Sequence, residues 1–216
     1  MRRLIVVLLT LGSIACSCLF SADEPVITYT KSFPGSVPEY VSIELHKDGS
    51  GIYKEATDDE DPVSFKVVPE DVHMVFGLAE TLNKFQTPLE SGLKVANMGK
   101  KTFAWREGPK KYETTFNFSL DENAKTLLDW FERVTESQQL YFILERAVKF
   151  DKLGVNKALL QVESAWDRKR LIAADRFLPL LDRVAKNDSY LHMARERAAA
   201  LGDTFRTAKS GKAAGE

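Results

Sequence analysis

Residues 119–150, SLDENAKTLLDWFERVTESQQLYFILERAVKF, decide the organisation of this chain of 216 residues. The stretch contains no glycine or proline, and its apolar side chains recur at alternating steps of three and four. That spacing is typical of one face of an amphipathic helix. Ser119 and Glu122 have the spacing of a capping box, so we predict that they open a long helix. The residues on the stripe are Ala124, Leu127, Phe131, Val134, Gln138, Tyr141 and Val148, with Leu128, Leu140 and Leu144 beside them.

The residues after this stretch supply further helices for the long helix to pack on. At about 1.5 Å per residue, a helix of this length reaches roughly 45 Å, which is longer than a small sheet is wide. Three later segments, 156–170, 175–187 and 189–207, also show the helical spacing of apolar residues. We therefore predict an all-helical region over 119–207, followed by a disordered tail over 208–216, where the sequence has little to bury.

The chain before residue 119 shows the period of two that β-strands have. Residues 26–33 are rich in the β-branched and aromatic side chains that favour a strand. Val41, Ile43 and Leu45 alternate with polar residues, and glycines follow shortly after them, so residues 40–55 are predicted to form a hairpin.

More strands and one helix complete this N-terminal half. Residues 63–67 alternate again, and residues 103–118 read as a second hairpin around a Gly-Pro turn. Between these segments the apolar spacing becomes helical from Pro69 onward. We therefore predict that residues 23–118 form an antiparallel sheet of about six strands with one helix, and that the chain has an α+β fold.

One segment of the N-terminal half follows neither period. Residues 86–100, QTPLESGLKVANMGK, exceed the usual length of a connection between elements. Long loops on a rigid scaffold often carry binding residues. The sequence therefore indicates a binding surface on this loop.

The N-terminus has the layout of an export signal. Arg2 and Arg3 precede an apolar run that starts at Leu4, and small residues follow the run. This order is typical of a secretory signal peptide, so residues 1–22 are predicted to direct export. The apolar run, at about eleven residues, is shorter than the roughly twenty that a membrane-spanning helix needs. We expect the protein outside the cytoplasm, either in the periplasm or secreted.

Two cleavage sites remain open for this signal. Cleavage after Ala15 leaves Cys16 as the first mature residue, and a cysteine in that place resembles a bacterial lipoprotein. Cys16 is therefore the candidate for lipidation, and its acyl chain would be the contact of this protein with a membrane. Cleavage after Ala22 would instead remove Cys16 and Cys18 and release a soluble protein.

The sequence contains none of the motifs that reveal catalysis directly. It has no Gly-x-Ser-x-Gly elbow, Walker loop, Rossmann glycine pattern or His-Glu-x-x-His segment. His46, His73 and His192 have no second histidine or cysteine at ligand spacing. We therefore assign no catalytic and no metal-binding residue, and we expect no cofactor. Thirty basic and thirty-one acidic residues leave no positive excess, which argues against a nucleic-acid partner.

Three further clusters have a structural explanation that we favour over a functional one. The acidic residues 58–61 have the wrong spacing for an EF-hand and are interpreted as a solvated turn. The basic residues 168–170 fit the last turn of a helix better than a site for anionic lipid. Trp105, Trp130 and Trp166 lie in periodic segments, so we predict them in the core and not in a sugar- or peptide-binding groove.

The opening strands carry a resemblance to known sequences. The segments Ser36–Tyr40 (SVPEY) and Asp48–Gly51 (DGSG), together with Tyr53, resemble a small β-rich domain of extracytoplasmic bacterial proteins of unknown function. The resemblance covers residues 26–56. It implies a location outside the cytoplasm and the opening hairpin, and it implies no activity or site residues.

The export signal and the missing catalytic motifs together predict a non-catalytic binding or assembly module of the bacterial cell envelope. Its expected partner is a protein or another envelope component. Two other functions stay open. One is a hydrolase of envelope polymers whose catalytic carboxylates are brought together by the fold. The other is a peptidase inhibitor that presents residues 86–100, which would then be ordered, exposed and resistant to cleavage.

Overall fold

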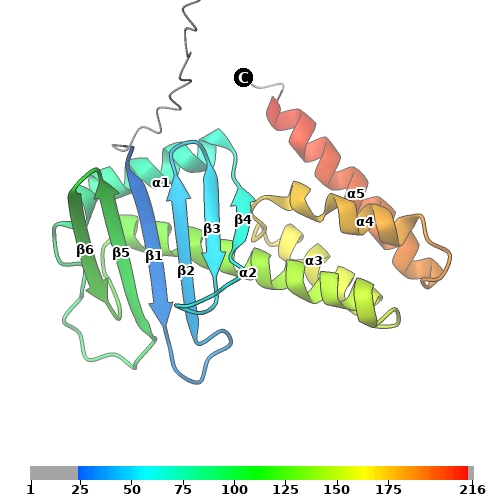
Figure 1. The fold of residues 1–216 in the computed structure, drawn as a ribbon, viewed down its shortest axis with the longest axis horizontal. Helices are drawn as coiled ribbons and strands as arrows, with labels where there is room; N and C mark the ends of the chain where they lie inside the picture. Colours follow the sequence, from blue (N-terminus) through cyan, green and yellow to red (C-terminus); the bar gives the residue numbers. More distant parts are fainter. Residues whose placement is uncertain (1–23, 214–216) are drawn as a thin grey trace, which may run out of the picture.

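Six β-strands form one antiparallel sheet in the computed structural model of the protein, which describes residues 24–213. The strands are β1 (Val26–Ser32), β2 (Tyr40–His46), β3 (Ser50–Lys54), β4 (Val63–Lys66), β5 (Lys100–Glu107) and β6 (Lys110–Phe116). Their order across the sheet is β4-β3-β2-β1-β5-β6, and every neighbouring pair is antiparallel (Figure 1). The predicted α+β class and the six-stranded antiparallel sheet are confirmed.

One face of this sheet is covered by helices. β1 lies between β2 and β5 and pairs with both along its whole length. Its inward side chains, Ile27 and Tyr29, are two residues apart and fully buried. The helices α1 (Pro69–Thr81) and α2 (Glu122–Phe150) lie on the same face of the sheet, behind it in Figure 1. The covered face therefore holds the core of the N-terminal half.

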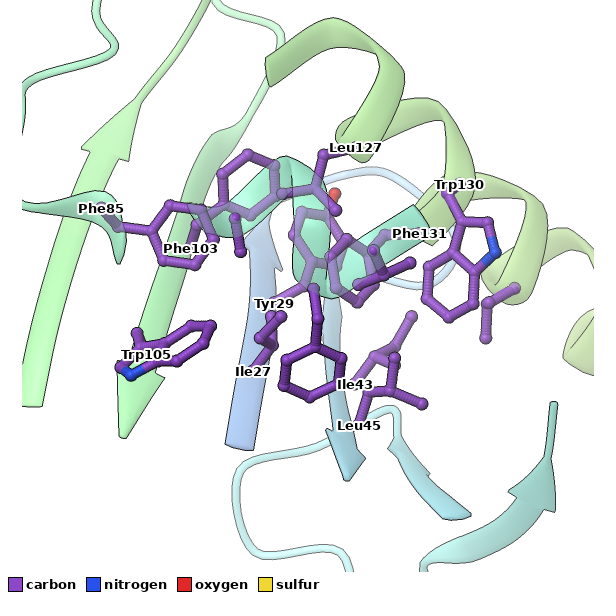
Figure 2. Packing of buried hydrophobic residues seen from close by; sticks show 14 of the residues in the cluster. Ile27, Tyr29, Ile43, Leu45, Phe85, Phe103, Trp105, Leu127, Trp130 and Phe131 are labelled. Atoms are coloured by element: carbon purple, nitrogen blue, oxygen red, sulfur yellow. The ribbon is translucent and has the colours of Figure 1, made fainter. Parts of the chain in front are cut away.

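Aromatic rings fill the space between the sheet and these helices (Figure 2). The ring of Tyr29 stacks on that of Phe131, with 4.9 Å between the ring centroids. Phe103 lies 5.9 Å from Phe131, and Trp105 stands edge-on to Phe76 at 5.8 Å. Offset and edge-to-face geometries of this kind are the favourable ones for aromatic pairs. The core on the sheet is thus built from interlocking rings.

Two glycines shape the hairpin of β2 and β3. Gly49 has a φ of +83°, a conformation that glycine adopts without strain. Gly51 lies under the ring of Phe65, and a Cβ at Gly51 would stand only 2.3 Å from the Cζ atom of that ring. The ring of Phe65 therefore packs directly on the backbone of β3, which no other residue at position 51 would allow without a shift.

The helix α2 begins two residues later than the sequence pattern indicates. Asp121 is its N-cap, and the Asp121 carboxylate accepts hydrogen bonds from the backbone N–H groups of Asn123 and Ala124. Ser119 does not cap the helix, because its hydroxyl accepts from the backbone N–H of Asp121 at 3.2 Å. The predicted capping box of Ser119 and Glu122 was therefore wrong. The chain is still irregular at Ser119, and the next strong cap residue takes its place.

Three α-helices follow the long one. They are α3 (Val155–Asp167), α4 (Leu178–Ala185), which follows a 3-10 turn at Ala174–Phe177, and α5 (His192–Ala213). We predicted a disordered tail over 208–216, whereas residues 208–213 belong to α5 and residues 214–216 are outside the described part of the chain. Alanine and lysine favour a helix there, and Lys209 forms an ion pair with Asp175 at 2.8 Å.

The buried residues form two clusters that meet along α2. The sheet core contains the inward residues of the strands, α1, and α2 as far as Val134. The helical core begins at Leu144 of α2 and includes α3, α4 and α5. Ile172 links the two halves, since it is buried in the sheet core and its backbone N–H donates to Ser137 Oγ at 2.9 Å. The change from one core to the other therefore falls inside α2 and not at residue 119.

The export prediction rests on N-terminal residues that the structure does not describe. Residues 1–22 and the lipidation candidate Cys16 lie outside the described residues. Within residues 24–213, no helix combines the length and the apolar character that crossing a membrane requires. The location outside the cytoplasm stays a prediction from the N-terminal sequence.

Candidate functional site

A pocket of about 460 Å³ opens where one end of the sheet meets the first turns of α2. Five parts of the chain enclose it: the end of β1, the start of β5, the residues after β6, the loop of residues 86–99 and the N-terminal half of α2. The pocket volume lies in the range that small-molecule and side-chain ligands occupy. The pocket is therefore the first place to look for a binding function.

The walls of the pocket are largely apolar. Phe33, Phe118 and Leu128 contribute aromatic and aliphatic side chains, and Met98 comes from the loop. Apolar side chains are also exposed elsewhere on the same loop and in the segment before α2. Those residues are Leu93, Val95 and Leu120. An exposed apolar surface beside a pocket is a common property of binding sites.

Charged side chains at the pocket are held by partners. Lys31 and Glu132 face one another from β1 and α2, with 3.8 Å between ammonium and carboxylate. Asp129 binds Arg170 at 2.6 Å and Arg133 at 3.2 Å. The two carboxylates that line the pocket, Asp129 and Glu132, are thus both engaged with cations.

Lys101 lies at the floor of the pocket and is buried, with 4% of its surface exposed. Its ammonium group donates to the backbone carbonyl oxygens of Met98 at 3.1 Å, Gly99 at 3.2 Å and Asn117 at 2.8 Å. Burial lowers the pKa of Lys101, and the nearby charge of Lys31 lowers it further. All three ammonium protons are used, so Lys101 joins the loop to the end of β6.

The burial of Lys101 was not predicted, although the sequence contains a signal for it. Lys101 stands in register with Phe103 and Trp105, the inward residues of β5. A lysine at an inward position of a strand destabilises the fold unless its buried ammonium group is hydrogen-bonded or paired. Such a lysine therefore predicts a set of acceptors around it. The neighbouring Lys100, which points outward and is exposed, hides this signal in a Lys-Lys pair.

The loop of residues 86–99 is exposed but fixed by side-chain hydrogen bonds. The amide group of Asn117 donates to the carbonyl oxygen of Ala96 at 2.9 Å and accepts from the backbone N–H of Met98 at 2.7 Å. The carboxylate of Glu90 accepts from the backbone N–H of Asn117 at 2.6 Å, and this bond lowers the pKa of Glu90. The loop therefore has a defined shape without secondary structure of its own.

The tryptophans do not gather at a groove. Trp105 and Trp130 are buried in the sheet core, as the sequence predicts. Trp166 packs against the ring of Phe205, with 4.8 Å between centroids, beside the helical core. None of the three lines the pocket.

The basic residues 168–170 have a different place from the predicted one. They follow α3, which ends at Asp167, so they are not in its last turn. The Arg170 guanidinium binds Glu136 at 2.8 Å and also reaches Asp129, and Arg168 lies 3.4 Å from the same Glu136. These contacts join the segment after α3 to α2, which explains the charges by packing.

The remaining polar clusters are local. Asp59, in the acidic turn, accepts hydrogen bonds from the backbone N–H groups of Glu55 at 3.2 Å and Asp61 at 3.1 Å. His46 and His192 each lie beside one glutamate of their own element. Within the part of the chain that the structure describes, no three histidine, cysteine or acidic side chains gather in an arrangement that could hold a metal ion.

Comparison with known proteins leaves the pocket as the basis for a functional argument. The resemblance of residues 26–56 to an extracytoplasmic bacterial domain stays a prediction from the quoted residues. No protein-family model matches the chain, and a search of the curated proteins finds no match either.

Proposed function

We propose that this protein is an exported, non-catalytic binding module of the bacterial cell envelope, and that it binds an extended polypeptide segment at the pocket. The observation that carries the proposal is the apolar pocket beside a loop held in one shape by Asn117 and Lys101. A preformed apolar cavity accepts a ligand without the entropic cost of ordering its own walls.

The apolar surface outside the pocket favours a long ligand over a small one. Leu93 and Val95 are exposed on the same loop as Met98, which lines the pocket itself. A ligand confined to the cavity would leave these side chains in water, whereas a polypeptide can cover them while one apolar side chain enters the pocket. Lys31 and Glu132 at the pocket offer charges of both signs to polar groups of such a segment.

The binding part of the proposal can be tested with a random-peptide display library. We expect the full-length protein to enrich peptides with a large apolar residue. The substitution Met98→Glu should weaken their binding at least about tenfold, because it places a charge in an apolar site. Val37→Glu, at an exposed position in the turn between β1 and β2, is the matched control and should leave binding unchanged. No enrichment, or equal binding by Met98→Glu, would contradict the proposal.

The export part of the proposal has a separate test. Intact-mass measurement of protein from the membrane fraction should give a chain that begins at an acylated Cys16. A mature chain that begins at Asp23 would exclude the lipid anchor but keep the export. Native protein in the cytosol with Met1 attached would overturn the export itself.

A peptidase inhibitor is the second candidate, and the Asn117 contacts support it. Inhibitory loops must be extended, exposed and held rigid so that the bound peptidase cannot complete cleavage. The loop of residues 86–99 is exposed, and Asn117 bonds to the backbone on both sides of Asn97. Incubation with a panel of purified peptidases should then show inhibition without cutting, and Asn117→Ala should convert the loop into a substrate. Cleavage of the wild-type loop at the same rate would exclude this function.

A further inference from the structure

Large apolar side chains are exposed at the end of the molecule that lies farthest along α2 from the pocket. Phe150 is 81% exposed and Leu153 is 76% exposed, at the end of α2 and in the turn that follows. Leu191 and Met193, around the start of α5, are 45% and 56% exposed. We call these four residues the helical tip.

The two turns that carry the helical tip lie side by side. The hydroxyl of Tyr190, in the turn between α4 and α5, donates to the carbonyl oxygen of Val148 in α2 at 2.9 Å. The ammonium of Lys152 stands 6.0 Å from the centroid of the Tyr190 ring. In Figure 1 both turns are at the right-hand end of the helical half. The tip is therefore one surface made of two segments that are distant in sequence.

Positive charges surround the most exposed pair of apolar side chains. Residues 143–157 contain four basic side chains, Arg146, Lys149, Lys152 and Lys157, and two acidic ones, Glu145 and Asp151, a net charge of +2. Lys149 forms an ion pair with Glu145 at 3.2 Å. Arg146 and Lys152 form no ion pair with any residue between 24 and 213. The surface around Phe150 thus has positive charge left for an anionic partner.

We propose that the helical tip docks on an anionic lipid bilayer, with Phe150 and Leu153 entering the interfacial region. Phe150 at the end of α2 and Leu153 in the turn after it are both largely exposed, an arrangement that suits a soft surface better than a rigid pocket. Lysine and arginine beside inserted apolar side chains are attracted by anionic head groups. The proposal does not depend on the function of the pocket.

This contact would complement the predicted lipid anchor. A single acyl chain gives marginal and reversible membrane binding, and a second apolar or basic contact makes the attachment stable. The helical tip would also set the orientation of the protein. The α2 residues that line the pocket, from Ala124 to Glu132, lie some 18–26 residues before Phe150, so docking at the tip would hold the pocket roughly 30–40 Å away from the bilayer when α2 stands upright.

The test uses a tryptophan placed at the tip and vesicles with brominated acyl chains, which quench nearby tryptophans. In the full-length protein, Leu153→Trp should be quenched by vesicles that contain phosphatidylglycerol and much less by purely phosphatidylcholine vesicles. Val37→Trp is the matched control, since Val37 is exposed but lies on the sheet half. The apolar N-terminus is common to both variants, so a difference between them reports the tip alone.

Charge reversal provides the second arm. Lys152→Glu combined with Arg146→Glu, made in the Leu153→Trp protein, should weaken vesicle binding about tenfold or more and abolish the preference for anionic lipid. Far-UV circular dichroism would verify that the helices are intact. Equal quenching at positions 37 and 153, or none at 153, would overturn the proposal. Concentration-dependent dimers that protect position 153 without vesicles would also overturn it, in favour of a second copy as partner.

Discussion

The sheet core and the helical core are built from different kinds of side chain. In the sheet core, α2 contributes Phe131, whose ring stacks on Tyr29 of β1, and Trp130, which stands edge-on to Phe131. In the helical core the same helix contributes Leu144, Ala147 and Val148, and α5 contributes two alanines together with Leu201 and Phe205. Helices that pack on one another approach to about 8–10 Å, which small residues permit. The comparison teaches that one helix can serve two cores when aromatic side chains face the sheet and aliphatic ones face the other helices.

The largest expected effect is the loss of the ring that joins α2 to the sheet. Phe131→Ala should lower the free energy of unfolding by about 3–5 kcal/mol, because Phe131 is fully buried among Tyr29, Phe103 and Trp130. Val162→Ala in α3 is the counterpart in the helical core and should cost less, since fewer atoms are removed.

Urea unfolding followed by far-UV and near-UV circular dichroism would measure both variants. We expect a single transition in each, because α2 belongs to both cores. Two separated transitions in Phe131→Ala would show that the cores unfold independently, which would contradict the shared role of α2.

The next largest effect concerns the close contact of a strand with a ring. Gly51→Ala should destabilise the protein by about 1–3 kcal/mol, because its Cβ would collide with the ring of Phe65. Gly77→Ala, in the middle of α1, has no atom within 4 Å of the new Cβ and should stabilise by about 0.5–1 kcal/mol. Thermal unfolding of the two variants would measure both changes in stability. If Gly51→Ala and Gly77→Ala changed the melting temperature in the same direction, the contact with Phe65 would not explain the effect at Gly51.

A cap substitution should distinguish the two residues that precede α2. Asp121→Ala should cost about 1 kcal/mol, since two backbone N–H groups lose their acceptor. Ser119→Ala should cost less, because the Ser119 hydroxyl accepts from a single N–H outside the helix. We expect a lower urea midpoint for Asp121→Ala than for Ser119→Ala. The opposite order would support the capping box of Ser119 and Glu122.

The smallest effect at neutral pH is expected at a buried hydroxyl in the sheet core. The hydroxyl of Tyr29 is buried without a hydrogen-bond partner among the described residues, so Tyr29→Phe should stabilise by up to about 1 kcal/mol. Burial also raises the pKa of Tyr29, and of Tyr53, far above the ordinary value.

These raised pKa values predict a loss of stability at alkaline pH. Above about pH 10 the unfolded chain releases the tyrosine protons while the folded chain keeps them, so the free energy of unfolding falls as pH rises. The urea midpoint of the wild type should therefore drop between pH 9 and pH 11, and Tyr29→Phe should reduce the drop. An identical pH dependence in both proteins would mean that Tyr29 ionises freely in the folded state.

Much of the sheet was predictable because alternation is a local property of the sequence. The inward positions of β2, namely Val41, Ile43 and Leu45, follow from the period of two, and the predicted hairpin of residues 40–55 is the pairing of β2 with β3. The long helix was predictable for the same reason. Lys101 was not recognised, because its burial depends on carbonyl groups supplied by the loop and by Asn117.

The exposure of the apolar side chains near the helix ends could not be predicted from the periodicity of the sequence. Phe150 and Leu153 carry no sequence signal that separates them from core residues, since their exposure depends on which elements pack nearby. The pocket is also beyond sequence reasoning, because it needs β1, the 86–99 loop and α2 in one place. Two residues of the loop, Asn97 and Met98, line the pocket, and the binding surface that the sequence indicates on this loop stays a prediction.

The bonds of Asn117 and Lys101 have a consequence for the order of folding events. Lys101 on β5 pairs with Phe116 on β6, the residue before Asn117. The side chains of Lys101 and Asn117, which hold the loop, therefore come together only when β5 and β6 have paired. Pairing of that hairpin must therefore precede the immobilisation of Met98, whose amide proton would gain protection from exchange after those of β5. We therefore expect the loop at the pocket to become ordered after the β5–β6 hairpin has formed.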